Sequence, residues 1–195
     1  MQFRSVWLLI ALLPGFAVAI AYARLLGRIS ELFDGVGQEL TNALMQFAVF
    51  AGLSVIVFLV ASRSARGSGP HKTLLIFMAA TVALAISREG SEIIVFVSGF
   101  TQMENLVMSV TLGSLAGAGI GCSVGVLLYY LLLAIPERRA TWISLALLCL
   151  AAASMCAQAT QFLIQADWIS YGGHLWDSSG FISEQSLVGQ LLYAL

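Results

Sequence analysis

Three ionisable residues stand within five positions of a strongly apolar stretch. The segment reads Arg88-Glu89-Gly90-Ser91-Glu92, and it lies near the middle of the apolar range 74–100. At the centre of a membrane helix, each such charge costs about 2.5–3.5 kcal/mol. The three charged side chains are therefore expected to face protein or water, and not lipid.

The spacing of this cluster predicts which side chains meet. Arg88 and Glu92 are four residues apart on one helical face, so they can form an ion pair, with the arginine pairing one carboxylate at a time. Glu89 and Glu92 are three apart, so both carboxylates can converge beside the helix, and Gly90 leaves room for a ligand. Carboxylate oxygens suit a hard cation. The excess negative charge favours a cation site over the alternative, an ion-paired network that only locks helices together.

The composition identifies the setting of the cluster. Of 195 residues, 59% are hydrophobic and 10% are charged, against roughly 25% charged in an average soluble domain. This excludes a soluble globular enzyme, a disordered chain and a nucleic-acid-binding protein. The sequence shows no nucleotide-binding loop, nucleophile–base pair or cysteine-rich metal site, so we predict no enzymatic activity and no bound cofactor.

Five apolar stretches are long enough to cross a bilayer, which takes roughly 20 residues each. We predict an all-α, polytopic membrane protein with one domain over 1–195 and spans at about 6–23, 42–61, 74–100, 106–135 and 142–166. Residues 182–195 are too few to span, and we expect a short non-spanning helix there. The first stretch also resembles a cleavable signal peptide that ends in Ala21-Tyr22-Ala23, which stays an alternative.

The few charges divide between the two sides of the membrane. The N-terminus and the connectors 62–72 and 136–139 share one side, which carries Arg4, Arg63, Arg66, Lys72, Arg138 and Arg139. The other side has only Arg24 and Arg28. The positive-inside rule therefore predicts a cytoplasmic N-terminus and an external C-terminus in a cell membrane. Most carboxylates fall outside, where they would attract cations or merely reflect outer loops poor in Lys and Arg.

A ridge of small residues runs along the fourth span. It consists of Gly113, Gly117, Gly121 and Gly125. Glycines at intervals of four let another helix approach closely. The partner helix is expected either within the same chain, the favoured alternative, or in a second copy that forms a homo-oligomer.

The arginine–glutamate segment resembles the RExxE motif of the iron permeases, the oxidase-dependent iron transporters. Residues 29–40 are similar to that family's acidic loop, and residues 176–192 are similar to its segment before the last span. The resemblance implies that Glu89 and Glu92 ligate iron, with Arg88 as their ion-pair partner. The other candidate metal ligands are Asp34, Glu39, Asp177 and Glu184. Iron would be the transported substrate, and an extracytoplasmic oxidase or iron-handling protein would be a partner.

The sequence also departs from the family pattern. The resemblance implies seven spans and a second RExxE in the first, whereas this sequence contains one RExxE and is expected to lack the family's first and last spans. We therefore expect either a permease that moves iron inward, or a non-transporting membrane subunit or remnant that needs a second copy or a partner. A fragment of a longer chain is the third alternative.

Overall fold

The structure is a computed structural model that describes residues 6–66, 71–101 and 106–170. These residues form α1 (Val6–Ser30), the 3-10 turn η1 (Phe33–Gly35), α2 (Gly37–Arg66), α3 (His71–Thr101), α4 (Val107–Ala134) and α5 (Glu137–Gln165). All five α-helices are long and apolar enough to cross a membrane. The predicted polytopic helical fold is confirmed. The short helix expected over 182–195 falls outside the described residues.

Helices α1, α2, α3 and α5 begin or end beyond their predicted spans, whereas α4 (Val107–Ala134) agrees with its predicted span to within one residue at each end. Helix α1 continues past Ala23 to Ser30, and α5 begins at Glu137 instead of Trp142. Helical hydrogen bonding does not stop at the edge of the hydrocarbon, because charged side chains such as Arg24 and Arg28 extend toward the headgroups and water. The connectors are correspondingly shorter than the sequence suggested.

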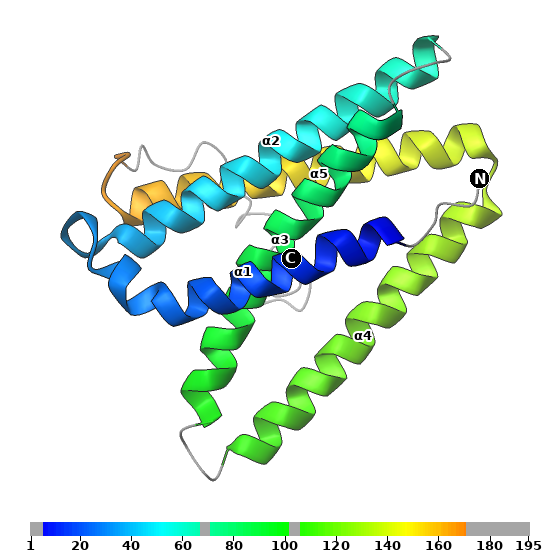
Figure 1. Ribbon diagram of the computed structural model, residues 1–195. Coiled ribbons are helices and arrows are strands. Elements are labelled where there is room, and N and C mark those ends of the chain that lie inside the picture. The colour runs from blue at the N-terminus through cyan, green and yellow to red at the C-terminus, as the bar shows by residue number, and fades with distance from the viewer. Residues whose placement is uncertain (1–5, 67–70, 102–105, 171–195) are drawn as a thin grey trace, which may run out of the picture.

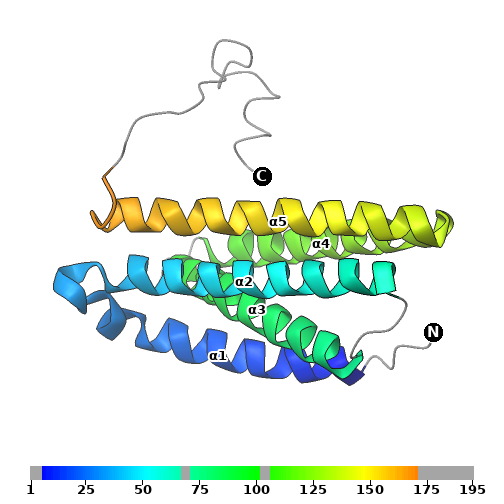
Figure 2. The same cartoon turned by 90° about the horizontal axis from the view of Figure 1, so that it is seen from above.

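The turn between α1 and α2 has a left-handed backbone. Phe33, Asp34 and Gly35 have φ angles of 53°, 61° and 97°, a region that only glycine adopts without strain. A side chain on Gly37 would collide with the carbonyl oxygen of Ile29. The tight reversal places the carboxylates of this turn at one end of the bundle, the same end at which α5 finishes (Figure 2).

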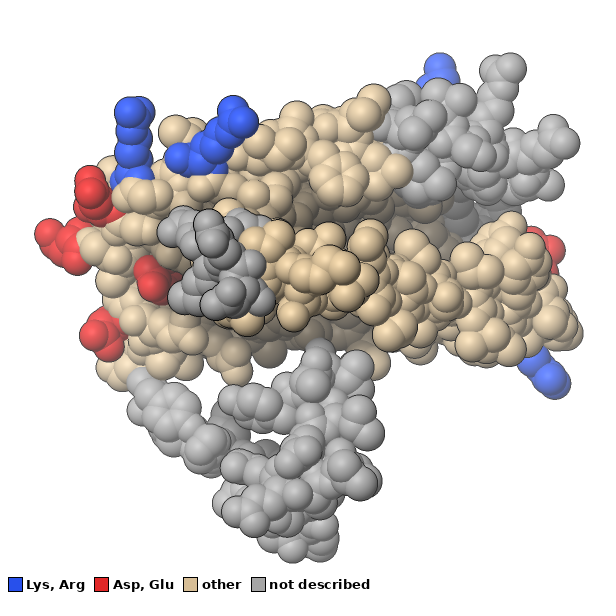
Figure 3. Space-filling view, turned by 90° about the horizontal axis from the view of Figure 1, so that it is seen from below, with Lys and Arg blue, Asp and Glu red and all other residues tan. Residues whose placement is uncertain are grey.

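On the face shown in Figure 3, charged side chains gather at the two ends, with most red acidic groups at one end beside blue basic groups. Glu89 and Glu92, which are half-exposed within α3, are the exception to this arrangement. This acidic end is formed by the α1–α2 turn and the end of α5. Glu31 and Asp34 lie in the turn, and Asp167 follows α5. Lys72, Arg138 and Arg139 belong to the first turns of α3 and α5, at the opposite end. An uncharged belt between charged ends is what a membrane-spanning bundle requires.

Helix α3, which carries the ionisable cluster, is the centre of the packing. It packs on α1 and α2, and α2 packs along α5 (Figure 1). Small residues make these contacts close: a Cβ on Gly15 would lie 3.0 Å from Ala83 O, and one on Gly90 would lie 3.2 Å from Ala19 Cβ. The Ser87 hydroxyl donates to Gly15 O at 3.2 Å. These contacts fix the depth of the ionisable cluster along the bundle and its position between α1 and α2.

We expect Gly15→Val to destabilise the α1–α3 contact. The added side chain would overlap the α3 backbone, and overpacking of this kind costs about 1–3 kcal/mol. The measurement is thermal unfolding in detergent. Gly27→Val is the matched control in the same helix, because nothing lies within 4 Å of a Cβ there. Equal melting temperatures for the two variants would contradict the close packing of α1 on α3.

Helix α4 stands apart from the other helices over most of its length (Figure 1). None of its residues is buried. A Cβ added at any of its four ridge glycines, Gly113, Gly117, Gly121 and Gly125, would meet nothing within 4 Å. Packing of this ridge within the chain, the favoured alternative from the sequence, is therefore not found among the described residues.

Candidate metal site

Arg88 holds both carboxylates of the cluster at once. Its Nη1 lies 2.5 Å from Glu89 Oε1, and its Nη2 lies 2.8 Å from Glu92 Oε1. The expectation that the arginine pairs one carboxylate at a time is wrong. A guanidinium presents several N–H donors in a rigid planar fork, so adjacent nitrogens can serve two acceptors. Arg88 thereby brings the two carboxylates to one place beside α3.

Helix α5 supplies a further partner for the arginine. The Arg88 Cζ atom lies 5.6 Å from the centroid of the Phe162 ring, within the range of a cation–π contact. Arg88 is 7% exposed, and its Nε has no hydrogen-bond partner among the described residues. The Arg88 guanidinium is therefore buried between α3 and α5.

The two carboxylates are much more open than their partner. The side chains of Glu89 and Glu92 are 53% and 44% exposed, whereas that of Arg88 is 8% exposed. Carboxylates at this depth cannot face lipid without a large penalty. Water, a bound cation or another protein segment must therefore cover them in the membrane. The five described helices cover only the arginine.

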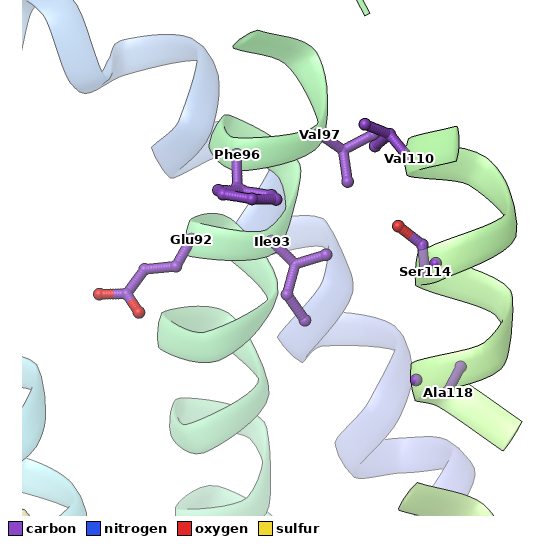
Figure 4. Close-up of a pocket in the computed structure, with 9 residues that line it drawn as sticks. Glu92, Ile93, Phe96, Val97, Val110, Ser114 and Ala118 are labelled. Atoms are coloured by element: carbon purple, nitrogen blue, oxygen red, sulfur yellow. The ribbon is translucent and has the colours of Figure 1, made fainter. Parts of the chain in front are cut away.

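Glu92 borders two cavities, and the surface of both is mostly apolar. One, of about 770 Å³ between α3 and α4, is lined mainly by apolar groups such as Ile93, Val97 and Val110. In Figure 4 the Glu92 carboxylate points away from the labelled α4 residues. The other cavity, of about 290 Å³, lies among α1, α2 and α3 and has polar lining from Tyr22 and Asn42. More polar side chains line the smaller cavity than the larger one, so it offers the carboxylate more hydrogen-bonding partners.

The other candidate ligands do not join this pair. Asp34 lies in the exposed turn η1, and Glu39 in the first turn of α2. Asp177 and Glu184 lie outside the described residues. Across residues 6–66, 71–101 and 106–170, no three His, Cys, Asp or Glu side chains come close enough to hold a metal ion together. A cation at Glu89 and Glu92 would thus complete its coordination with water, backbone oxygens or groups beyond these residues.

Sequence reasoning missed two aromatic residues near the cluster. Tyr22 donates to Asn42 Oδ1 at 3.1 Å, and Phe162 stacks under Arg88. Gln46 on α2 donates to Gln158 Oε1 on α5 at 2.7 Å. Phe162 follows Gln158 by four residues and so shares its helical face. This spacing of four residues was the signal in the sequence that could have linked Phe162 to the polar face of α5.

The model of the iron permease FTR1 family matches residues 4–195. The chain belongs to this family. Membership confirms the resemblance drawn from the Arg88–Glu92 segment and establishes a membrane protein of an iron-transporting family. No curated protein and no solved structure matches the chain. In this iron permease family member, the RExxE segment lies on α3 and not in a loop.

Proposed function

We propose that this chain binds an iron ion between Glu89 and Glu92 and passes it inward across the cell membrane. One observation carries the proposal: a buried arginine holds two half-exposed carboxylates side by side within a membrane-spanning helix. Ionisable groups inside a membrane are costly, and they commonly mark substrate or ion pathways.

Arg88 suits a site that must release its ion. With one cation and two anions, the cluster keeps one net negative charge. A carboxylate has two oxygens, so contact with Arg88 through Oε1 leaves each side chain able to ligate a metal. The guanidinium also competes with the metal for the same carboxylates. That competition weakens binding, and transport requires binding that is favourable enough to load and weak enough to unload.

The distribution of charge supports inward movement. The acidic end carries Glu31, Asp34 and Asp167, and the opposite end carries Lys72, Arg138 and Arg139. By the positive-inside rule the basic end is cytoplasmic, which puts the N-terminus inside. The acidic end would then attract iron outside, and an extracytoplasmic oxidase or iron-handling protein would deliver it there.

Iron flux into proteoliposomes tests the proposal. The purified chain is reconstituted, and the uptake of radioactive ferrous and ferric iron is compared with that of empty vesicles. We expect uptake of one of the two ions above the level of empty vesicles. Absence of uptake for both ions, from protein shown to be folded by size-exclusion chromatography, would contradict autonomous transport.

The second candidate function is a membrane subunit that a second copy must complete. Two observations favour it: α4 buries none of its residues, and the carboxylates of Glu89 and Glu92 are not covered by the five described helices. A second copy that packs on the glycine ridge would cover apolar surface next to the α3–α4 cavity. Transport would then require the oligomer.

Substitutions on α4 separate these two candidates. If a second copy packs on the ridge, we expect Gly117→Leu to lower the yield of crosslinked dimer in membranes, because close helix approach depends on small residues. Gly119→Leu is the matched control, since Gly119 lies on nearly the opposite face of α4 and likewise has nothing within 4 Å of a Cβ. If Gly117→Leu and Gly119→Leu give the same yield of crosslinked dimer, the ridge is not an interface between two copies.

A further inference from the structure

We propose that the cavity among α1, α2 and α3 is a hydrated vestibule through which the ion reaches Glu92 from the acidic end, and that the Tyr22–Asn42 hydrogen bond is its constriction. This inference rests on the proposed iron permease function and adds an entry route to it. No lining residue of the vestibule other than Glu92 belongs to the predicted ligand set.

Polar groups from three helices line this cavity. Helix α2 contributes Gln38 and Asn42, α1 contributes Tyr22, and α3 contributes Ser91 and Glu92. Gln38 lies in the first turn of α2, at the acidic end, whereas Glu92 lies well inside α3. The cavity therefore extends from the acidic end to the carboxylate. Its volume of about 290 Å³ holds several water molecules, each of which takes about 30 Å³ in the liquid.

Buried polar atoms without protein partners continue this polar wall along α2. Glu39, Asn42 and Gln46 follow one another at helical spacing on one face. Asn42 and Gln46 are 3% and 0% exposed, and Glu39 Oε2 and Gln46 Oε1 have no hydrogen-bond partner among the described residues. Such atoms are rare and costly in folded proteins unless water or an ion satisfies them. Asn42, which lies between Glu39 and Gln46 on this face, lines the cavity, so the cavity borders a face of α2 whose unpartnered atoms favour hydration.

One hydrogen bond joins two walls of the vestibule. The Tyr22 hydroxyl on α1 donates to Asn42 Oδ1 on α2 at 3.1 Å, and both residues line the cavity. The contact draws the two helices together between the acidic end and Glu92. Tyr22 is half-buried and Asn42 is buried, and a single hydrogen bond contributes only about 0.5–1.5 kcal/mol net, so it can narrow the route without sealing it.

The larger α3–α4 cavity does not offer the same route. Among the described residues, only Glu92 and Ser114 bring polar side chains to its lining, and the Glu92 carboxylate is directed away from the labelled residues of α4 (Figure 4). A cation in that space would find few oxygen ligands and would lose its hydration. Val95 and Val97 on α3 each line one of the two cavities, so their access to water is expected to differ.

Cysteine accessibility in the full-length protein tests the vestibule. In a background with serine at positions 122, 149 and 156, Val95→Cys places a thiol in the proposed vestibule and Val97→Cys places one in the larger α3–α4 cavity. A charged, membrane-impermeant methanethiosulfonate is applied to each face of reconstituted vesicles. Glu31→Cys, in the exposed α1–α2 turn, marks the acidic face. We expect Val95→Cys to react from that face about tenfold faster than Val97→Cys, because the thiolate forms in water and not in an apolar site.

Two further comparisons separate this inference from the function it rests on. Adding Tyr22→Phe to Val95→Cys removes the hydrogen bond and is expected to speed labelling about twofold to tenfold. Iron is expected to slow the labelling of Val95→Cys, and Glu92→Gln is expected to abolish that protection. Equal labelling of Val95→Cys and Val97→Cys would overturn the vestibule, and an unchanged rate with Tyr22→Phe would overturn the constriction. Fast labelling without protection by iron would instead overturn the metal site at Glu92.

Discussion

Glu89→Gln and Glu92→Gln are each expected to abolish iron uptake in cells and in proteoliposomes. Glutamine keeps the size of the side chain but removes the negative charge that ligates the ion. Loss of even a group that only orients a metal ligand typically lowers metal affinity about 10–100-fold, and loss of a ligand should cost at least as much. Initial uptake rates, normalised to the amount of folded protein, measure the effect.

Matched controls make this result interpretable. Glu31→Gln is the same chemical change in the exposed α1–α2 turn, and we expect it to leave uptake within about twofold of wild type at physiological salt, where exposed charges are screened. Glu92→Asp keeps the charge but shortens the side chain, so partial uptake is expected. Wild-type uptake by both glutamine variants would show that the ion takes another path.

Arg88→Leu is expected to destabilise the protein severely. Arg88 is buried, pairs with both Glu89 and Glu92 and lies against Phe162. Removing it would leave two like charges unpaired in the membrane, and breaking a buried ion pair in this way typically costs about 3–5 kcal/mol. Membrane abundance and thermal unfolding in detergent are the measurements.

A triple variant separates the structural role of the arginine from the transport role of the carboxylates. Arg88→Leu combined with Glu89→Gln and Glu92→Gln removes all three charges, and replacing a whole buried ion-pair network by neutral groups is often close to neutral for stability. We expect this variant to recover wild-type abundance without iron uptake. If Arg88→Leu alone is as stable as wild type, or the triple variant is no more stable than Arg88→Leu, the arginine does not act as the internal counter-ion.

Much of the fold was predictable because the bilayer imposes strong constraints. Composition excluded a soluble protein, and the apolar stretches located all five helices, since only a fully hydrogen-bonded backbone is stable in hydrocarbon. The helix ends were less predictable. Arg24 and Glu137 read as connector residues but belong to α1 and α5, because a helix can continue into the headgroup region without any change of composition.

The candidate site was predictable to the extent that it lies on one helix. Arg88, Glu89 and Glu92 are close in space because they are close in sequence, and helical periodicity relates their side chains. The sequence therefore determined the membrane setting, the charge asymmetry and the paired carboxylates. The spacing of the carboxylates indicates a hard cation but not which one. Family membership is what points to iron.

Only the tertiary structure decided what surrounds these carboxylates. Phe162 under the Arg88 guanidinium, the Tyr22–Asn42 hydrogen bond and the vestibule beside Glu92 each join residues of different helices. The separation of α4 from the other helices likewise depends on which helices contact one another. Helix–helix contacts in a membrane depend on shape and on single polar pairs, because apolar surface is no better covered by protein than by lipid. Periodicity along one helix does not record which faces meet, so this part of the site became visible only when the helices were placed together.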